Sequence, residues 1–278
     1  MNRTTTQRDG ATTGWTEVVI GWKAVIVTSL ALAILLSWTG TAQARGWMGF
    51  TMGRGSGGVR VRKVLPTSPA QRSGLKAGDL VTAVDGHKVA TPRQVIRAAS
   101  GKGQGQSITL SVVSSGTTRL VSLRLAAVPP LQQLLRLLLV GSRAPSFSVQ
   151  STSGRWISLS GLRGKVVLVE FWGTWCASCK ISLKKLVRLH RRFGRRGLVI
   201  LGPARNTLAE VKAEAAKLPV PFDLAADPGA KAARRYHFFK TPSIVLIDRK
   251  GVIRQVWVGS SYSLARMSAL VRQLLAER

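Results

Sequence analysis

Only two cysteines occur in the 278 residues, and they stand close together as Cys176 and Cys179. The pair follows a largely apolar run at residues 165–172 and precedes a helical pattern that extends to Phe193. A strand that leads into a helix here brings both sulfurs within bonding reach. It also places the first sulfur at the helix N-terminus, where a thiolate is stabilised. The pattern predicts a pair that exchanges two electrons between dithiol and disulfide.

A metal site is the first alternative for this pair, because two cysteines at this spacing form half of a zinc site. Zinc would need two further ligands, and the histidines His87, His190 and His237 are not paired at ligand spacing. Copper would need a histidine beside the sulfurs, for which His237 is the candidate. A permanent structural disulfide is the other alternative. We expect redox chemistry with no metal and no cofactor.

The N-terminal segment predicts export. Residues 24–38 form an uninterrupted apolar run after three basic residues, and a small-x-small pattern follows at residues 42–44. The run is short for a membrane span, which needs about 20 residues, and is typical of a secretory signal. We predict that residues 1–44 are a signal peptide or a membrane anchor. The rest of the chain is then expected in the periplasm or cell envelope, either soluble or held at the inner membrane.

The chain is strongly basic, with 42 Lys and Arg against 11 Asp and Glu and a net charge of +31. The excess is spread over both halves of the chain, so it attracts polyanions in general. An anionic membrane surface is one expected partner. Because an exported protein rarely meets nucleic acid, no specific nucleic-acid binding is expected.

Two prolines at residues 129–130 mark a boundary between domains. Residues 45–128 show short strands, turns and one helix, which Thr91 caps at residues 91–100. Residues 129–140 form a short apolar segment that we predict to be a linker helix. In residues 141–278 strands and helices alternate, which indicates a central sheet covered by helices.

Several motifs accompany the cysteines in a fixed order. They are Ala144-Pro145-Ser146-Phe147, the run at residues 164–172, the Trp-Cys-x-x-Cys motif, and Lys240-Thr241-Pro242-Ser243 before an Ile-Asp-x-x-Gly hairpin. With them, residues 138–278 resemble the thioredoxin fold. The resemblance is closer to its exported thiol-disulfide oxidoreductases, the TlpA-like or redoxin group. An α/β thioredoxin fold is therefore the predicted class of this part.

The two cysteines are expected to have different roles. Cys176, with its thiol towards solvent, attacks a client disulfide as a thiolate, and the less exposed Cys179 resolves the mixed disulfide. Lys180 and Lys184 would lower the thiol pKa values further if they approach. Glu170 interrupts the apolar run where thioredoxins carry a buried acid that relays protons to the second cysteine. The alternative is an acid that reaches solvent at a strand edge.

The resemblance also implies roles for three other residues. Pro242 after Thr241 resembles the cis-proline of the fold, which lets Thr241 offer its main chain to a bound peptide. The alternative is a trans proline that opens a strand. Trp175 is expected to shield the thiols and contact substrate, with a plain packing role as the alternative.

The chain departs from the family in the helix after the cysteines. The dipeptide between them is Ala177-Ser178, without the common proline. Ser182 and Lys184 stand where many relatives carry Glu and Pro, so the usual helix kink is expected to be missing. Basic residues at i, i+4 spacing along this helix predict a solvated face or a docking strip for an acidic substrate or membrane; they are Lys180, Lys184, Arg188, Arg192 and Arg196.

The first half carries motifs that are weak singly but specific in their order. They are Trp47-Met48-Gly49-Phe50, residues 64–70, residues 73–79 and Val84-Asp85-Gly86, followed by the helix after Thr91. Residues 46–128 thereby resemble a bacterial PDZ domain, a small and mainly β fold. The resemblance implies that a peptide C-terminus adds as a strand, its carboxylate held by N–H groups around Met48, Gly49 and Phe50. A spacer without ligand binding is the alternative.

Together these features predict an extracytoplasmic enzyme that reduces or exchanges disulfides of client proteins. A thiol donor would supply electrons, and the PDZ domain would recruit the clients. One alternative is a PDZ adaptor whose cysteines sense oxidation. Another is a peroxiredoxin-like peroxidase, which the position of Thr174, two residues before Cys176 and without a preceding proline, disfavours.

Overall fold

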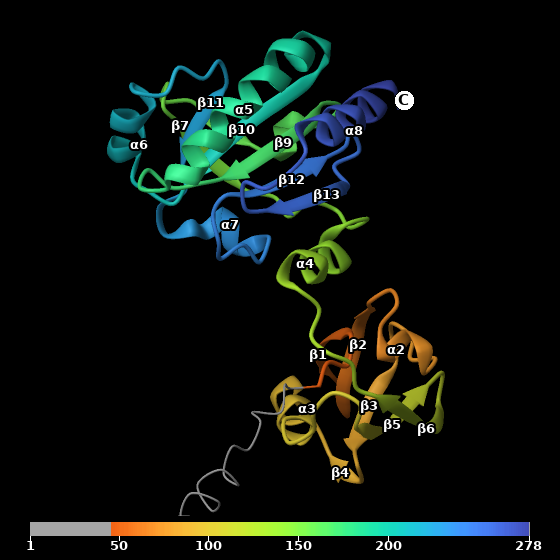
Figure 1. The fold of residues 1–278 in the computed structure, drawn as a ribbon. Helices are drawn as coiled ribbons and strands as arrows, with labels where there is room; N and C mark the ends of the chain where they lie inside the picture. The colour runs from red at the N-terminus through yellow and green to blue at the C-terminus, as the bar shows by residue number, and fades with distance from the viewer. Residues whose placement is uncertain (1–45, 278) are drawn as a thin grey trace, which may run out of the picture. The chain divides into compact units, whose positions relative to one another are not determined.

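The structure, a computed structural model, describes residues 46–277. The predicted signal or anchor segment, residues 1–44, lies outside this range. Between residues 46 and 277, no helix combines the length and the apolar character of a membrane span. The range contains two separate sheets, which are described one at a time (Figure 1).

The first sheet has six antiparallel strands in the order β1-β2-β3-β5-β6, with β4 paired to β3. Its strands are β1 (Phe50–Gly55), β2 (Gly58–Val64), β3 (Leu80–Val84), β4 (His87–Lys88), β5 (Ser107–Ser114) and β6 (Thr117–Arg124), with helices α2 (Pro69–Arg72) and α3 (Pro92–Ala99). α3 begins at the predicted cap, Thr91. The Thr91 hydroxyl accepts a hydrogen bond from the Gln94 backbone amide, and the Gln94 side-chain oxygen accepts one from the Thr91 backbone amide. This capping box fixes where the helix starts.

The second sheet has seven strands in the order β13-β12-β9-β10-β11-β7-β8. They are β7 (Ser148–Ser151), β8 (Trp156–Ser158), β9 (Val166–Phe171), β10 (Leu198–Ala204), β11 (Asp223–Ala226), β12 (Ser243–Ile247) and β13 (Ile253–Val258). The central strands β9, β10 and β11 are parallel, and their outer neighbours β12 and β7 are antiparallel to them. The predicted α/β thioredoxin-type architecture is confirmed in this part of the chain.

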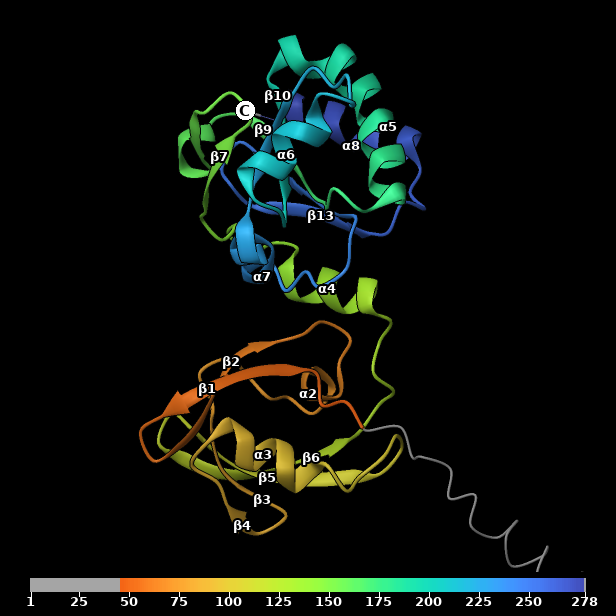
Figure 2. The ribbon, with the colours of Figure 1, turned by 90° about the vertical axis from the view of Figure 1, so that its left-hand side faces the viewer.

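Helices cover both faces of this sheet. The α-helices are α4 (Leu131–Leu139), α5 (Ala177–Phe193), α6 (Leu208–Ala215), α7 (Lys231–Arg235) and α8 (Leu264–Ala276). Three short 3-10 helices also occur: η1 (Ser160–Leu162), η2 (Gly194–Arg196) and η3 (Pro228–Ala230). α5 and α8 pack on one face, and α4 and α7 pack on the other (Figures 1 and 2). β9 is buried along its whole length. Its side chains alternate between the two cores, since Val166 and Leu168 face α5 and α8 while Val169 and Phe171 face the opposite side.

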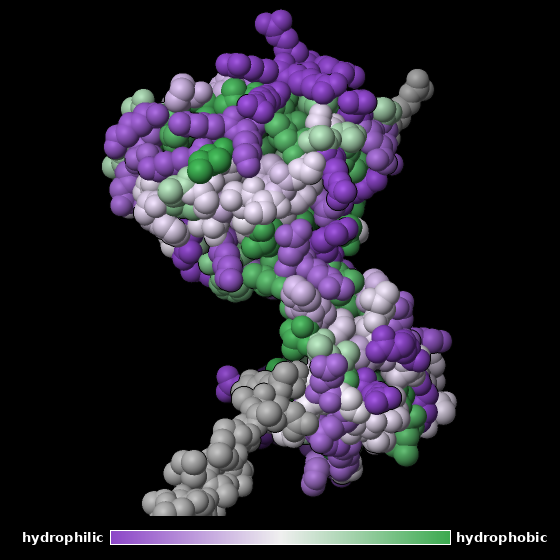
Figure 3. Space-filling view, viewed as in Figure 1, coloured by the Kyte–Doolittle hydropathy of each residue, from purple (hydrophilic) through white to green (hydrophobic). Residues whose placement is uncertain are grey.

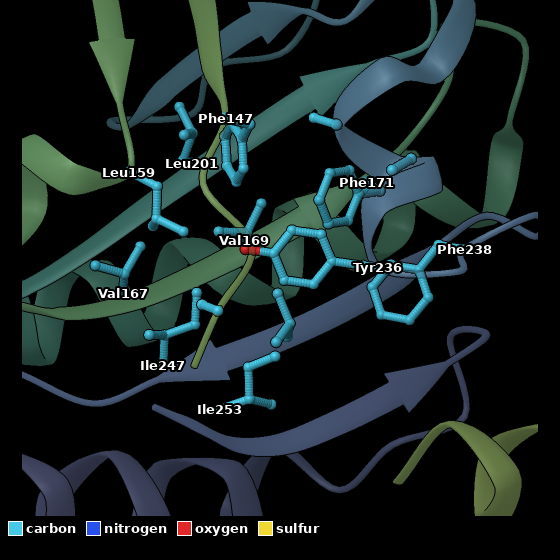
Figure 4. Close-up of a cluster of buried hydrophobic side chains, with 14 of the residues drawn as sticks. Phe147, Leu159, Val167, Val169, Phe171, Leu201, Tyr236, Phe238, Ile247 and Ile253 are labelled. Atoms are coloured by element: carbon cyan, nitrogen blue, oxygen red, sulfur yellow. The ribbon is translucent and has the colours of Figure 1, made fainter. Parts of the chain in front are cut away.

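An aromatic cluster fills the core on the α4 and α7 side (Figure 4). The Phe171 ring lies 5.4 Å from Tyr236 and 5.5 Å from Phe238, between ring centroids. The buried Tyr236 donates a hydrogen bond to the carbonyl of Pro145 at 2.8 Å. This hydrogen bond attaches the Ala-Pro-Ser-Phe motif to the core.

The helix after the cysteines agrees with the departure noted in the sequence. α5 runs for 17 residues through Lys184 without interruption, and no proline interrupts its hydrogen bonds there. The β7–β8 hairpin, β11 and α7 were not foreseen. Each is short, and none carries a hydrophobic period long enough to predict it.

Candidate active site

Cys176 and Cys179 are joined by a disulfide at the start of α5. Cys176 is the N-cap residue of the helix, and its sulfur accepts a hydrogen bond from the Cys179 amide at 3.2 Å. The Ser178 hydroxyl lies 3.4 Å from the same sulfur. Because unpaired N–H groups and the positive end of the helix dipole meet here, the position favours a Cys176 thiolate in the reduced protein.

The sulfur pair is more covered than the sequence predicted. Cys179 is fully buried and Cys176 is 6% exposed, so the expected order holds, but Cys176 does not stand open to solvent. Both belong to one buried cluster with Trp172, whose indole N–H donates to the Gly202 carbonyl at 2.9 Å. Trp175 differs from it, with 66% of its surface exposed. Trp175 therefore belongs to the surface beside the sulfurs, and a plain packing role does not fit it.

The Thr241–Pro242 peptide bond is cis, as predicted. Pro242 comes directly before β12, whose antiparallel register pairs Ser243 with Phe171 at the end of β9. From Phe171 the chain continues into the loop that holds the cysteines. The cis-proline segment and the cysteine loop therefore leave the sheet at the same edge.

Glu170 is a buried acid in the centre of the sheet. β9 lies between β12 and β10, and Glu170 is 0% exposed, so the alternative of an acid reaching solvent at a strand edge is wrong. Its Oε2 accepts a hydrogen bond from the Ser182 hydroxyl at 2.9 Å, whereas its Oε1 has no partner within the described residues. Burial raises the pKa of Glu170 to about 8, although the Ser182 hydrogen bond acts in the opposite direction.

The carboxyl group lies under the helix turn that follows the cysteines. Ser182 comes three residues after Cys179 on the buried face of α5, and residues at this spacing are neighbours on a helix surface. A carboxyl that titrates near neutral pH can both accept and return a proton at this place. The geometry therefore offers a thiol pair and a proton-exchanging group on one side of the sheet.

Comparison with known proteins agrees with this geometry. The family model for the AhpC/TSA family matches residues 140–256, and the model for the PDZ domain matches residues 46–125. The thiol-disulfide oxidoreductase ResA of Bacillus anthracis is 31% identical over 121 residues, which are 43% of this chain and 70% of that protein. The chain belongs to the thiol-disulfide oxidoreductases.

Two further proteins extend the comparison. The thioredoxin-like protein YneN of Bacillus subtilis (strain 168) is 30% identical over 123 residues, which are 43% of this chain and 72% of that protein. A solved structure of a thiol:disulfide interchange protein from Chlorobium tepidum TLS is 26% identical. It covers 49% of this chain and 97% of its own, with a TM-score of 0.44.

Two side chains near Glu170, Ser182 and Tyr262, form hydrogen bonds that the sequence did not predict. In the sequence, Ser182 is only a departure from the family pattern, and Tyr262 belongs to no motif. The Tyr262 hydroxyl lies 2.9 Å from the Ser182 hydroxyl oxygen. One signal was available: Ser182 is a polar residue on the inward face of an amphipathic helix, where a buried hydroxyl needs a partner. Nothing in the sequence indicated that Tyr262, 80 residues later, would approach it.

Lys180, the residue after Cys179, was expected to lower the thiol pKa values if it approached the sulfurs. Lys180 Nζ forms an ion pair with Glu214 Oε1 at 2.6 Å, so its charge is engaged by a carboxylate and not by the sulfurs. Lys184 is exposed. Among residues 46–277 no three His, Cys, Asp or Glu side chains gather as a set of metal ligands.

In the PDZ unit of the oxidoreductase, β1 is one of the two strands at the ends of the path β1-β2-β3-β5-β6. α3 packs beside β1 (Figure 2), and the buried Phe50 is the first residue of the strand. The Met48 and Gly49 carbonyls accept the amides of Ala70 and Leu65 at 3.0 and 2.9 Å, which holds the loop before the strand. This edge is where a peptide strand can add, and ligand binding by Met48, Gly49 and Phe50 stays a prediction.

Proposed function

We propose that this oxidoreductase reduces or exchanges disulfides of client proteins through Cys176 and Cys179, with Glu170 as the proton relay. The observation that carries the proposal is the N-cap position of Cys176, with Cys179 buried three residues before Ser182, whose hydroxyl donates to the carboxyl of Glu170. The helix terminus favours the attacking thiolate, and the interior holds the group that activates the resolving thiol.

The reaction proceeds in two displacements. The Cys176 thiolate attacks one client sulfur, and the other client sulfur leaves and takes a proton. The Cys179 thiol then gives its proton to Glu170 and attacks Cys176, which releases the second client thiol. The client disulfide gains two electrons, the cysteine pair becomes a disulfide, and a thiol donor restores the dithiol. Run in reverse, the same steps oxidise a client.

Thr241 and Trp175 are proposed to position the client. Support comes from the strand register, which places Thr241 and Pro242 at the same end of the sheet as the cysteine loop, and from the exposed indole next to Cys176. An extended client segment would pair with the main chain of Thr241 while Trp175 contacts its apolar side chains.

Turnover of a disulfide protein tests this proposal. Full-length protein is supplied with dithiothreitol, and insulin disulfide reduction is compared with hydrogen peroxide consumption. We expect accelerated insulin reduction that is lost in Cys176→Ser. Peroxide consumption without insulin reduction would instead support the peroxidase.

The reduction potential of the Cys176–Cys179 pair decides the direction of electron flow. Equilibration with a thiol–disulfide buffer would give a value near or below about −250 mV for a reductant, which needs a dedicated electron supply. A value of about −120 to −180 mV would indicate an oxidant or isomerase.

We also propose that the PDZ unit recruits clients by their C-termini. Its support is the free edge of β1 beside α3. A fluorescent peptide ending in valine should bind the full-length protein, and the same peptide amidated at its C-terminus should bind at least tenfold more weakly. An affinity that changes on oxidation of the cysteines, without client turnover, would favour the redox-sensing adaptor.

The location of the protein is proposed to be extracytoplasmic, at or near an anionic membrane surface. Ion pairs within residues 46–277 engage only Lys102, Arg119, Arg155, Lys180, Lys217 and Arg254. Hydrophilic side chains crowd the outer surface over α5 (Figure 3), where the exposed cations are Lys184, Arg188, Arg191, Arg192, Arg195 and Arg196. Sedimentation with vesicles tests this: binding to phosphatidylglycerol but not to phosphatidylcholine is expected, with loss at high salt.

A further inference from the structure

A chain of hydroxyl groups connects Glu170 to the surface of the molecule. The Ser182 hydroxyl is fully buried and lies 2.9 Å from both Glu170 Oε2 and the Tyr262 hydroxyl. With the Ser182 hydroxyl hydrogen donated to the carboxylate, the Tyr262 hydroxyl has two acceptors on Ser182, the hydroxyl oxygen at 2.9 Å and the main-chain carbonyl at 3.4 Å. We propose that Tyr262, acting through Ser182, positions the Glu170 carboxyl for the proton transfers of the cysteine pair. This inference rests on the relay role proposed for Glu170.

The chain leaves one carboxyl oxygen free. Oε2 is held by Ser182, and Oε1 has no partner within the described residues. A carboxylate fixed through one oxygen cannot rotate freely, so the orientation of the other oxygen is set. Oε1 is therefore the atom available to accept a proton from Cys179, whose turn of α5 lies next to Ser182.

Tyr262 connects this arrangement to the exterior. It stands just before α8 and is partly exposed. Its ring lies 6.5 Å from Trp257 between centroids, and Lys185 Nζ stands 5.6 Å from the ring centroid. The aromatic and cationic neighbours hold the ring, so its hydroxyl points inward by packing and not only by its hydrogen bond.

The proton balance of the relay involves Cys179 and Glu170 alone. When Cys179 attacks Cys176, its S–H bond breaks and an O–H bond forms at Glu170 Oε1, which makes Glu170 a neutral acid. When a donor thiol later opens the disulfide and Cys179 leaves as a thiolate, that O–H bond breaks and the proton returns to the Cys179 sulfur. Ser182 and Tyr262 keep their own protons throughout and hold the carboxyl through Oε2.

Few other ionisable groups face Glu170. From α5, Ser182 contacts the carboxyl, Cys179 lies three residues before Ser182 in the same helix, and Lys185 stands near the Tyr262 ring. The segment before α8 contributes Tyr262. The strands β10 and β12 on either side of β9 contain no ionisable residue. Burial raises the pKa of Tyr262 to about 12, with Glu170 as a further cause, so the two groups influence each other.

A purely structural role would predict a different result. The Ser182 and Tyr262 contact also joins α5 to the start of α8, and its loss could simply weaken packing. Tyr236 offers a matched control, because it is the other tyrosine of the chain and its buried hydroxyl donates to Pro145. That bond lies in the core on the opposite face of the sheet, away from Glu170.

The test uses reduced full-length protein and dithionitrobenzoate as the disulfide probe. The first nitrothiobenzoate is released by Cys176 and the second by Cys179, so stopped-flow absorbance separates the resolving step. Its rate is measured from pH 5 to pH 10 in wild type and in Tyr262→Phe, Ser182→Ala, Glu170→Gln and Tyr236→Phe. Thermal unfolding of each variant reports packing.

We expect Tyr262→Phe to move the inflection of the resolving step upward by roughly half to one pH unit, since a carboxylate with less hydrogen-bond support is harder to ionise. The rate at pH 7 should fall about 3- to 10-fold. Ser182→Ala should shift the profile further, and Glu170→Gln should slow the step about 100-fold. Tyr236→Phe should keep the wild-type profile even where it unfolds earlier.

Two outcomes would overturn parts of the account separately. If Glu170→Gln slows resolution while Tyr262→Phe matches Tyr236→Phe, the positioning role of Tyr262 is wrong and the proposed relay stands. If Glu170→Gln leaves the rate and its profile unchanged, the relay itself is wrong.

Discussion

The Cys179 amide donates a hydrogen bond to the sulfur of Cys176 at 3.2 Å, inside the first turn of α5. Cys179, the proposed resolving cysteine, thus supplies through its backbone a donor to the sulfur of Cys176, the proposed attacking cysteine. Lys180, which follows directly, is paired with Glu214. We therefore expect the helix terminus, and not Lys180, to stabilise a Cys176 thiolate.

This arrangement predicts a lowered pKa for the Cys176 thiol, below the usual value of about 8.5. The pH dependence of its alkylation by iodoacetamide in the reduced Cys179→Ser protein measures it. We expect an inflection at least one pH unit lower than 8.5, and nearly the same inflection when Lys180→Gln is added. An inflection at or above 8.5 would contradict this explanation.

The buried Glu170 predicts a pH-dependent stability of the oxidised protein. Burial raises its pKa to about 8, against about 4.3 in an unfolded chain. Between these values the folded protein keeps a proton that the unfolded chain releases. The free energy of unfolding therefore falls as the pH rises through this interval, by roughly 5 kcal/mol if the whole shift is realised.

Urea unfolding of the oxidised full-length protein at pH 5 and pH 8 measures this effect in the transition of residues 129–278. Glu170→Gln is neutral at both pH values and should lose the decrease. Glu214→Gln is the matched control: the pKa of Glu214 is lowered by Lys180, so it is ionised in both states above pH 5. An equal pH dependence in wild type and Glu170→Gln would refute the prediction.

Two glycines of the PDZ unit predict different costs for the same substitution. Gly49 and Gly57 both have positive φ, +83° and +77°. A Cβ at residue 49 would lie 2.1 Å from Ser68 Cβ, whereas none of the described atoms lies within 4 Å of a Cβ at residue 57. Gly57→Ala should cost about 1 kcal/mol from backbone strain alone. Gly49→Ala should cost about 1–3 kcal/mol more from overpacking.

Urea unfolding of the PDZ unit and binding of the valine-ending peptide measure the two variants. Gly49→Ala should also weaken peptide binding, because it displaces the loop before β1. The alkylation rate of Cys176 should not change in either variant. Equal costs at the two positions would show that Ser68 yields without strain.

Much of the site was predictable because it depends on local sequence. The cysteine spacing, the cap of α5, the cis bond before Pro242 and the burial of Glu170 each follow from a short motif or from the position of one residue in an apolar run. The capping box at Thr91 was predictable for the same reason. These features need only a few neighbouring residues.

Contacts between distant segments were not predictable. Tyr262 approaches Ser182 across 80 residues, and Lys180 meets Glu214 on another helix. Both depend on how α5, α6 and α8 pack, which one sequence does not specify. The low exposure of Cys176 has the same origin, since its cover comes from the surrounding core.

The most direct test of the central claim is to trap the reaction halfway. Reduced full-length Cys179→Ser protein is mixed with insulin, and adducts are mapped by mass spectrometry under non-reducing conditions. The account predicts a mixed disulfide between Cys176 and insulin, stable because nothing resolves it, and no adduct in Cys176→Ser. An adduct on Cys179 of the Cys176→Ser protein, with none on Cys176 of the Cys179→Ser protein, would contradict the assigned roles.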